Sequence, residues 1–131
     1  MDTFFPVKTS ILVVDDEITN LSLVAGLLRE HYQVKVAKDA ERALVLAQRE
    51  QPDLILLDVM MPGELDGYQV CAKVKGDPML AGQTKVILLT ARAQKEDEEQ
   101  GRKAGADAYL TNAFSPLKLR DLVDNMLGMP S

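Results

Sequence analysis

Acidic residues follow two of the aliphatic runs in this sequence. Ile11 to Val14 leads directly into Asp15 and Asp16, and Leu54 to Leu57 leads into Asp58. Carboxylates held roughly 5 Å apart repel by about 3 kcal/mol per pair at an effective dielectric near 20, so a positive partner is expected. An all-oxygen site favours Mg²⁺ or Mn²⁺, and such a cation would let one aspartate attack a phosphoryl group. Any one of these acids alone is more simply explained as a turn former or a helix cap. That explanation is far weaker for all of them together.

Five segments have the composition of β-strands. Three aliphatic runs without polar alternation are typical of strands that are covered on both faces, and two further segments are weaker candidates. The strong candidates are Ile11 to Val14, Leu54 to Leu57 and Val86 to Leu89; the weaker ones are Gln33 to Ala37 and Ala108 to Leu110.

Amphipathic stretches lie between these strands. Their apolar residues recur at three-to-four-residue spacing, which predicts helices with one buried stripe each. The stripes are Leu21, Val24, Ala25 and Leu28; Ala40, Ala43, Leu44 and Ala47; Val70, Cys71 and Val74; and Leu119, Leu122, Val123 and Met126. The stretch Lys95 to Lys103 is polar all round and contains Gly101, so we expect a weakly anchored helix there.

The alternation of strands and helices predicts one α/β domain, a doubly wound five-stranded parallel sheet with helices on both faces. In such sheets ligands bind beyond the carboxyl ends of the strands. That edge would carry Asp15, Asp16, Asp58, Thr90 and the loop after Tyr109. The sequence therefore predicts that carboxylates and a hydroxyl from separate strands meet at one place.

Composition narrows the functional classes. The chain has 131 residues, enough for one domain. Its net charge of -5 argues against nucleic-acid binding by this segment. No apolar run is long enough to span a bilayer, which argues against a membrane span. The single cysteine, Cys71, cannot form an internal disulfide, and the opening MDTFFPVK is too short and polar for a signal peptide. We therefore expect a cytoplasmic domain.

Four segments together carry a family resemblance. ILVVDDE, LILLDVMMPGELDG, VILLTA and DAYLTNAF, in this order, resemble the receiver domain of two-component response regulators. The resemblance covers residues 9–128, which leaves 1–8 as an N-terminal extension and 129–131 as a C-terminal tail. It implies the flavodoxin-like (βα)5 fold with strand order 2-1-3-4-5. It also implies a phosphoprotein of signal transduction or a phosphorelay, which catalyses only its own phosphorylation and dephosphorylation and is otherwise no enzyme.

The resemblance further implies a metal site and an acceptor. Asp58 would accept the phosphoryl group from a sensor histidine kinase or a phosphotransfer protein. Mg²⁺, with Mn²⁺ as an alternative, would be held by Asp16 directly, by Asp15 through water, by Asp58 and by the backbone carbonyl of Met60. The backbone amides of Met60 and Ala91 would donate hydrogen bonds to the phosphoryl oxygens.

Two further residues take switching roles by the same resemblance. Thr90 would close on the phosphoryl group, and Tyr109 would swing inward behind it. This movement would repack the face formed by the fourth helix, the fifth strand and the fifth helix. That face could then bind an output domain or a second copy of the chain.

The fifth-strand motif departs from the family pattern. Asn112 and Ala113 stand where receiver domains usually have lysine and proline. A neutral hydrogen bond contributes about 1 kcal/mol, against about 1.5 to 3 kcal/mol for one with a charged partner, so we expect phosphate binding to survive and coupling to output to weaken. We also expect a trans Asn112–Ala113 peptide, because a cis bond without proline costs about 3 to 4 kcal/mol. PGELDG is one residue longer than the usual loop.

Three functional classes remain open from the sequence. The first is a phosphoacceptor switch, supported by the acids and Thr90. The second is a receiver-like interaction module that acts independently of phosphorylation, supported by the missing lysine. The third is a hydrolase with an aspartyl-phosphate intermediate, which the sequence disfavours because Met60, not a second acid, stands two residues after Asp58. His31 is interpreted as a solvated side chain or one favoured by the helix dipole, and Cys71 as a packing residue.

Overall fold

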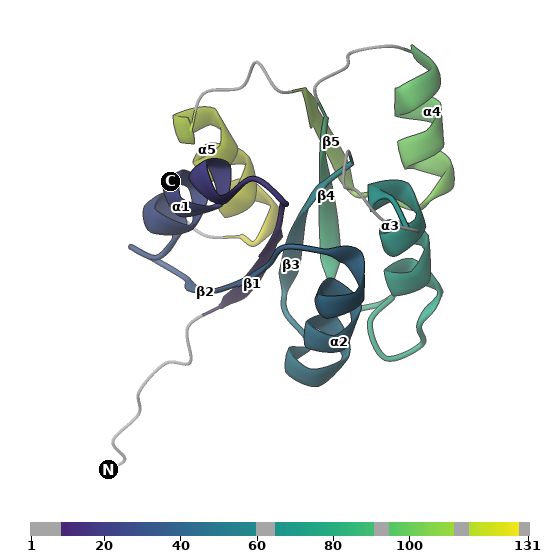
Figure 1. The fold of residues 1–131 in the computed structure, drawn as a ribbon, viewed down its shortest axis with the longest axis horizontal. Helices are drawn as coiled ribbons and strands as arrows, with labels where there is room; N and C mark the ends of the chain where they lie inside the picture. Colours follow the sequence, from purple (N-terminus) through teal and green to yellow (C-terminus); the bar gives the residue numbers. More distant parts are fainter. Residues whose placement is uncertain (1–8, 60–64, 91–94, 112–115, 129–131) are drawn as a thin grey trace.

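The computed structural model describes residues 9–59, 65–90, 95–111 and 116–128. Strands and helices alternate along the whole of this chain (Figure 1). The strands are β1 (Ser10–Val14), β2 (Gln33–Ala37), β3 (Leu54–Asp58), β4 (Lys85–Thr90) and β5 (Ala108–Thr111). The helices are α1 (Ile18–Leu28), α2 (Ala40–Glu50), α3 (Gly67–Gly76), α4 (Lys95–Lys103) and α5 (Pro116–Met126). Both weaker strand candidates are confirmed, and α4 has the predicted bounds.

The strands form one parallel sheet in the order β2-β1-β3-β4-β5, which confirms the expected topology. Val14 at the end of β1 pairs with Leu57 of β3, so Asp15 and Asp58 are the next residues on two neighbouring strands. Thr90 ends β4, which pairs with β3 on the other side. The register thus brings the predicted site residues to one edge of the sheet.

The sheet separates two hydrophobic cores. Helices α2 and α3 pack on one face and α1 and α5 on the other (Figure 1). The α2–α3 core contains Leu12, Val14, Ile55, Leu57, Val86 and Leu88 from the strands and Ala43, Ala47, Val70, Cys71 and Val74 from the helices. The α1–α5 core contains Ile11, Val13, Leu54, Leu56 and Ile87 with Ala25, Leu28, Tyr32, Leu119 and Val123. Alternate residues of each central strand enter opposite cores, which explains the runs without polar alternation.

Local signals fix where α2 and α3 begin. Asp39 caps α2 by accepting a hydrogen bond from the Arg42 amide at 2.8 Å. A capping box precedes α3, in which the Asp66 carboxylate accepts from the Gln69 amide at 2.9 Å and the Gln69 side chain accepts from the Asp66 amide at 2.8 Å. These bonds satisfy amides that have no partner within the helix. The capping box therefore fixes Gly67 as the first residue of α3.

Candidate functional site

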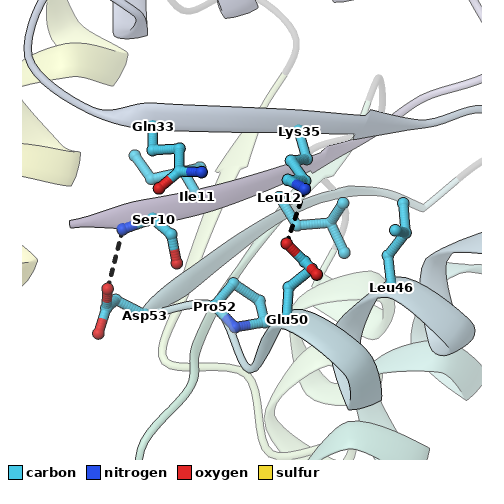
Figure 2. Close-up of a pocket in the computed structure, with 9 residues that line it drawn as sticks. All are labelled: Ser10, Ile11, Leu12, Gln33, Lys35, Leu46, Glu50, Pro52 and Asp53. Atoms are coloured by element: carbon cyan, nitrogen blue, oxygen red, sulfur yellow. Dashed lines mark hydrogen bonds and ion pairs between the residues drawn. The ribbon is translucent and has the colours of Figure 1, made fainter. Parts of the chain in front are cut away.

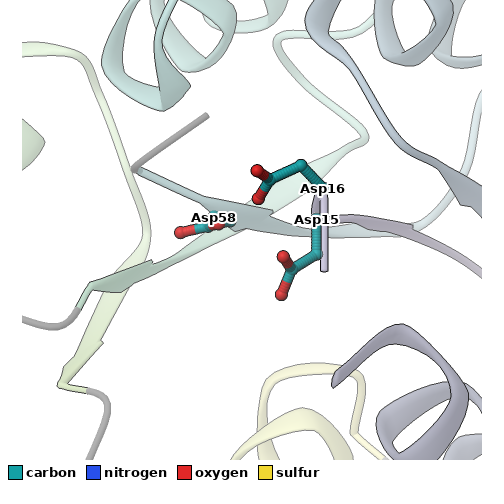
Figure 3. A group of neighbouring side chains, drawn as sticks. All are labelled: Asp15, Asp16 and Asp58. Carbon is teal, nitrogen blue, oxygen red and sulfur yellow. The ribbon is translucent and has the colours of Figure 1, made fainter. Parts of the chain in front are cut away.

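Three carboxyl groups meet at the carboxyl edge of the sheet. Asp15 and Asp16 follow β1, Asp58 ends β3, and one carboxylate oxygen of each lies within 4.8 Å of the others (Figure 3). Asp16 is exposed, whereas Asp58 is partly buried and Asp15 is only 9% exposed. Carboxylate oxygens are the ligands that Mg²⁺ prefers, so this set of donors fits the predicted cation. The predicted convergence of Asp15, Asp16 and Asp58 at one edge is observed, while their role as metal ligands stays a prediction.

The environment of Asp15 opposes ionisation of its side chain. Its amide donates to the Ala37 carbonyl at 3.1 Å, and its Oδ1 accepts from the Glu17 amide at 2.9 Å. Burial raises the pKa of the Asp15 carboxyl, and the charge of Asp16 adds to the rise, whereas hydrogen bonds with the Glu17 amide and with Asp58 lower it. A cation beside the group would favour the ionised form.

The backbone after Asp58 is held between a strand and a helix. Asp58 pairs in register with Leu89, and the Val59 amide donates to the Leu89 carbonyl at 2.9 Å. On the other side, the Gly67 amide at the start of α3 donates to the Val59 carbonyl at 3.1 Å. Sequence reasoning did not single out Gly67, although its place directly after the capping residue Asp66 was a usable signal.

Thr90 and Tyr109 lie on the face of the sheet that carries the α2–α3 core. Thr90 is 3% exposed at the end of β4, two residues after Leu88. Leu88 pairs in register with Tyr109 of β5, and the partly buried Tyr109 packs against that core. Thr90 therefore stands at the predicted edge, and Tyr109 is close to it on the neighbouring strand. Their movement as switch residues stays a prediction.

Some expected site residues lie outside the described residues. Met60, Ala91 and Asn112 are among them, as is the Asn112–Ala113 peptide. The metal role of the Met60 carbonyl, the amide donors of Met60 and Ala91 and the role of Asn112 therefore stay predictions. The same holds for most of the longer loop after Asp58.

Cys71 is a packing residue, as expected. Its side chain is fully buried in the α2–α3 core, and its thiol donates to the Ala104 carbonyl at 3.5 Å. Burial raises the pKa of the thiol to about 11. His31 is exposed and follows α1, which agrees with the interpretation as a solvated side chain.

A pocket lies at the opposite edge of the sheet. It has a volume of about 200 Å³ and is lined by the first residues of β1 and β2, the last turn of α2 and the residues before β3 (Figure 2). Lys35 and Glu50 form an ion pair of 2.7 Å across it, and the Asp53 carboxylate accepts from the Ser10 amide at 2.9 Å. Because the strands are parallel, this pocket is separate from the acids.

Comparisons with known proteins agree with this architecture. A family model described as the response regulator receiver domain matches residues 11–124. The response regulator PleD of Caulobacter vibrioides is 46% identical over 110 residues, which are 83% of this chain and 24% of PleD. The alkaline phosphatase synthesis transcriptional regulatory protein PhoP of Bacillus subtilis is 41% identical over 118 residues, which are 89% of this chain and 48% of PhoP. This chain spans less than half of either relative.

A solved structure is similar as well. The BeF3-activated receiver domain of DrrB, a response regulator of Thermotoga maritima, has a TM-score of 0.83 and 34% identity, covering 93% of this chain and 99% of that one. Within the described residues, every helix is too short or too polar to cross a membrane.

Proposed function

The chain belongs to the response regulator receiver domain family, and we propose on this basis that it accepts a phosphoryl group on Asp58. The donor would be the phosphohistidine of a sensor histidine kinase or of a phosphotransfer protein, in the cytoplasm. One observation supports the proposal most directly. One carboxylate oxygen each of Asp15, Asp16 and Asp58 lies within 4.8 Å of the other two, at the edge of the sheet where ligands of such folds bind.

The reaction is a displacement at phosphorus. A carboxylate oxygen of Asp58 forms the new bond to phosphorus, the phosphorus–nitrogen bond of the donor breaks, and the imidazole takes the electron pair. Asp15, Asp16, Asp58 and the Met60 carbonyl would hold Mg²⁺, which when bound neutralises charge that develops on the phosphoryl oxygens.

Thr90 and Tyr109 connect the acceptor to the output. The Thr90 hydroxyl donates a hydrogen bond to a phosphoryl oxygen, the amides of Met60 and Ala91 donate two more, and Tyr109 follows Thr90 inward. The product shifts the population toward this arrangement and changes the face made by α4, β5 and α5. Because Asn112 supplies no positive charge, the shift is weaker than a lysine would give. The changed face binds an output domain or a second copy of the chain.

The decisive test is the mass of the protein after reaction with a small acyl phosphate and Mg²⁺. The wild-type chain should gain one phosphoryl group, and the Asp58→Asn variant should gain none. Asp121→Asn, which removes an exposed acid of α5, is the matched control and should react like the wild type. An equal mass gain in Asp58→Asn would overturn Asp58 as the acceptor.

The missing lysine favours a second candidate, an interaction module whose output does not depend on phosphorylation. A partner that binds the wild-type chain and Asp58→Asn equally, with and without the phosphodonor, would support this candidate. A partner that distinguishes the phosphorylated wild-type chain from both would support the first.

A further inference from the structure

We propose that Gly67 is a positioning residue for the phosphorylation of Asp58, an inference that rests on the proposed function. Gly67 is the first residue of α3 and is buried. Its lack of a side chain lets the helix begin directly on the peptide that follows the acceptor. In this role the glycine sets where the Asp58 carboxylate lies relative to Asp15 and Asp16.

The contact at Gly67 leaves no room for a methyl group. A Cβ at this position would stand 2.4 Å from the backbone oxygen of Asp58 and 2.6 Å from the Cα of Val59. Both are backbone atoms, so no side-chain rotation can relieve the overlap. An alanine at position 67 must therefore displace either the start of α3 or the end of β3.

Helix α3 is firmly held along its length. Val70, Cys71 and Val74 are at most 1% exposed and pack into the α2–α3 core. Near its end, the Lys75 ammonium forms an ion pair of 2.7 Å with Asp107 and donates to the Thr84 carbonyl at 2.9 Å. A retreat of the helix would break these contacts, and well-packed interiors resist such shifts.

The other side of the contact is the end of β3, where pairing with β1 has ended and β4 still pairs. The register between β1 and β3 ends at the pair Val14–Leu57, while the register with β4 includes Asp58 and Leu89. Asp58 is thus the last residue of β3 and lies one residue beyond the last β1–β3 pair. We infer that the overlap moves the Asp58 backbone and, with it, the carboxylate.

Such a movement would act on the reaction more than on the fold. One oxygen of each carboxylate lies within 4.8 Å of the other two, so displacing Asp58 changes both the cation site and its own approach to phosphorus. Misplacement of a reacting group by about 1 Å can slow a reaction by about a hundredfold.

The experiment compares Gly67→Ala with Gly76→Ala, at the two ends of the same helix. A Cβ on Gly76 meets no atom within 4 Å, so this variant introduces the same methyl group without a clash. Each variant reacts with a small acyl phosphate at saturating Mg²⁺, and the rate of phosphorylation is followed by mass. Mg²⁺ affinity is measured by NMR, since the chain has no tryptophan for fluorescence. Circular dichroism gives the folded fraction of each variant. If this fraction falls, trimethylamine N-oxide is added to restore the folded state.

Gly67→Ala should react at least about tenfold more slowly per folded molecule and bind Mg²⁺ more weakly, while Gly76→Ala should match the wild type. A variant that is less stable but reacts at the wild-type rate per folded molecule would show a purely structural role and overturn the inference. A wild-type chain that gains no phosphoryl group would instead overturn the proposed function, which the first measurement tests separately.

Discussion

The ring of Tyr109 on β5 occupies the space that a side chain on Gly101 of α4 would enter. A Cβ on Gly101 would be 3.2 Å from Cδ2 of Tyr109 and 3.2 Å from Cδ1 of Leu88. The helix is otherwise polar, so this buried glycine is one of the places where α4 meets the sheet. The residue proposed as the switch therefore packs on the helix whose face it would change.

Replacing Gly101 by alanine should shift the ring of Tyr109. Leu88 is fully buried and cannot retreat, whereas the partly buried Tyr109 can move outward by a few tenths of an ångström. Alanine also favours the helix by up to about 1 kcal/mol, so the free energy of unfolding should rise slightly. NMR of the tyrosine ring and denaturant unfolding measure the two effects. Unchanged Tyr109 resonances with displaced Leu88 methyl resonances would contradict this assignment.

Magnesium should stabilise the fold through the acid cluster. At about 100 times its dissociation constant, a ligand that binds only the folded state raises the free energy of unfolding by about 2.7 kcal/mol. Thermal unfolding of the wild-type chain should show this gain, and a chelator should remove it. The Asp16→Asn variant lacks one carboxylate charge of the cluster, so its free energy of unfolding should rise much less at the same Mg²⁺ concentration. Equal gains in both proteins would mean that Mg²⁺ binds elsewhere.

The hydrogen bond between Tyr32 and Asp124 should contribute to stability. The Tyr32 hydroxyl donates to the Asp124 carboxylate, and both side chains are buried between α1 and α5. Tyr32→Phe leaves the carboxylate without this donor and should lower the free energy of unfolding by about 1.5 to 3 kcal/mol in denaturant titrations.

The pH dependence of the same bond gives a second readout. Burial and then Asp124 raise the pKa of Tyr32 above its ordinary value of 10.0. The stability that the Tyr32–Asp124 hydrogen bond contributes is therefore complete at a pH below the ordinary tyrosine pKa. It is lost as the pH rises above that value, because Tyr32 ionises first in the unfolded chain. Tyr32→Phe should lose less stability than the wild type over this alkaline range. A parallel loss in both proteins would rule out Tyr32 as the source.

Cys71 should resist alkylation in the folded protein. With a pKa of about 11 and full burial, its thiolate is scarce at pH 8. We expect iodoacetamide to modify the native chain more than about a hundredfold more slowly than the urea-unfolded chain. Rapid modification of the native chain, measured by mass, would show that α3 opens easily.

The strands and the acid cluster were predictable from short-range patterns. Ile11 to Val14 was predicted and Ser10–Val14 is observed, because a polar residue such as Ser10 can extend a ladder that depends on backbone hydrogen bonds. Asp15, Asp16 and Asp58 could be brought together because parallel strands end at a common edge. The order of the strands had to be taken from the family resemblance, as did the individual roles of the site residues.

Contacts that depend on the path of the chain were not predictable in this way. Tyr32 and Asp124 are 92 positions apart, and nothing near either residue marks them as partners. The sequence marks Gly67 only by its place after Asp66 and Gly101 only as a glycine within a polar stretch, and only the packing of α3 and α4 shows what a side chain at either position would meet. Leu46 was likewise absent from the predicted stripe of α2 but is 7% exposed, because the buried face is wider than the stripe.

The division of the interior by the sheet has an evolutionary consequence. Among the described residues, the α2–α3 core and the α1–α5 core have no side chain in common. Substitutions in different layers should therefore act almost additively, since epistasis arises mainly between residues in contact. Substitutions that lower stability in one core can then be compensated by substitutions in the other. Helix α5 can therefore change in sequence without constraining Val14 and Leu57, the α2–α3 core residues that precede the acids.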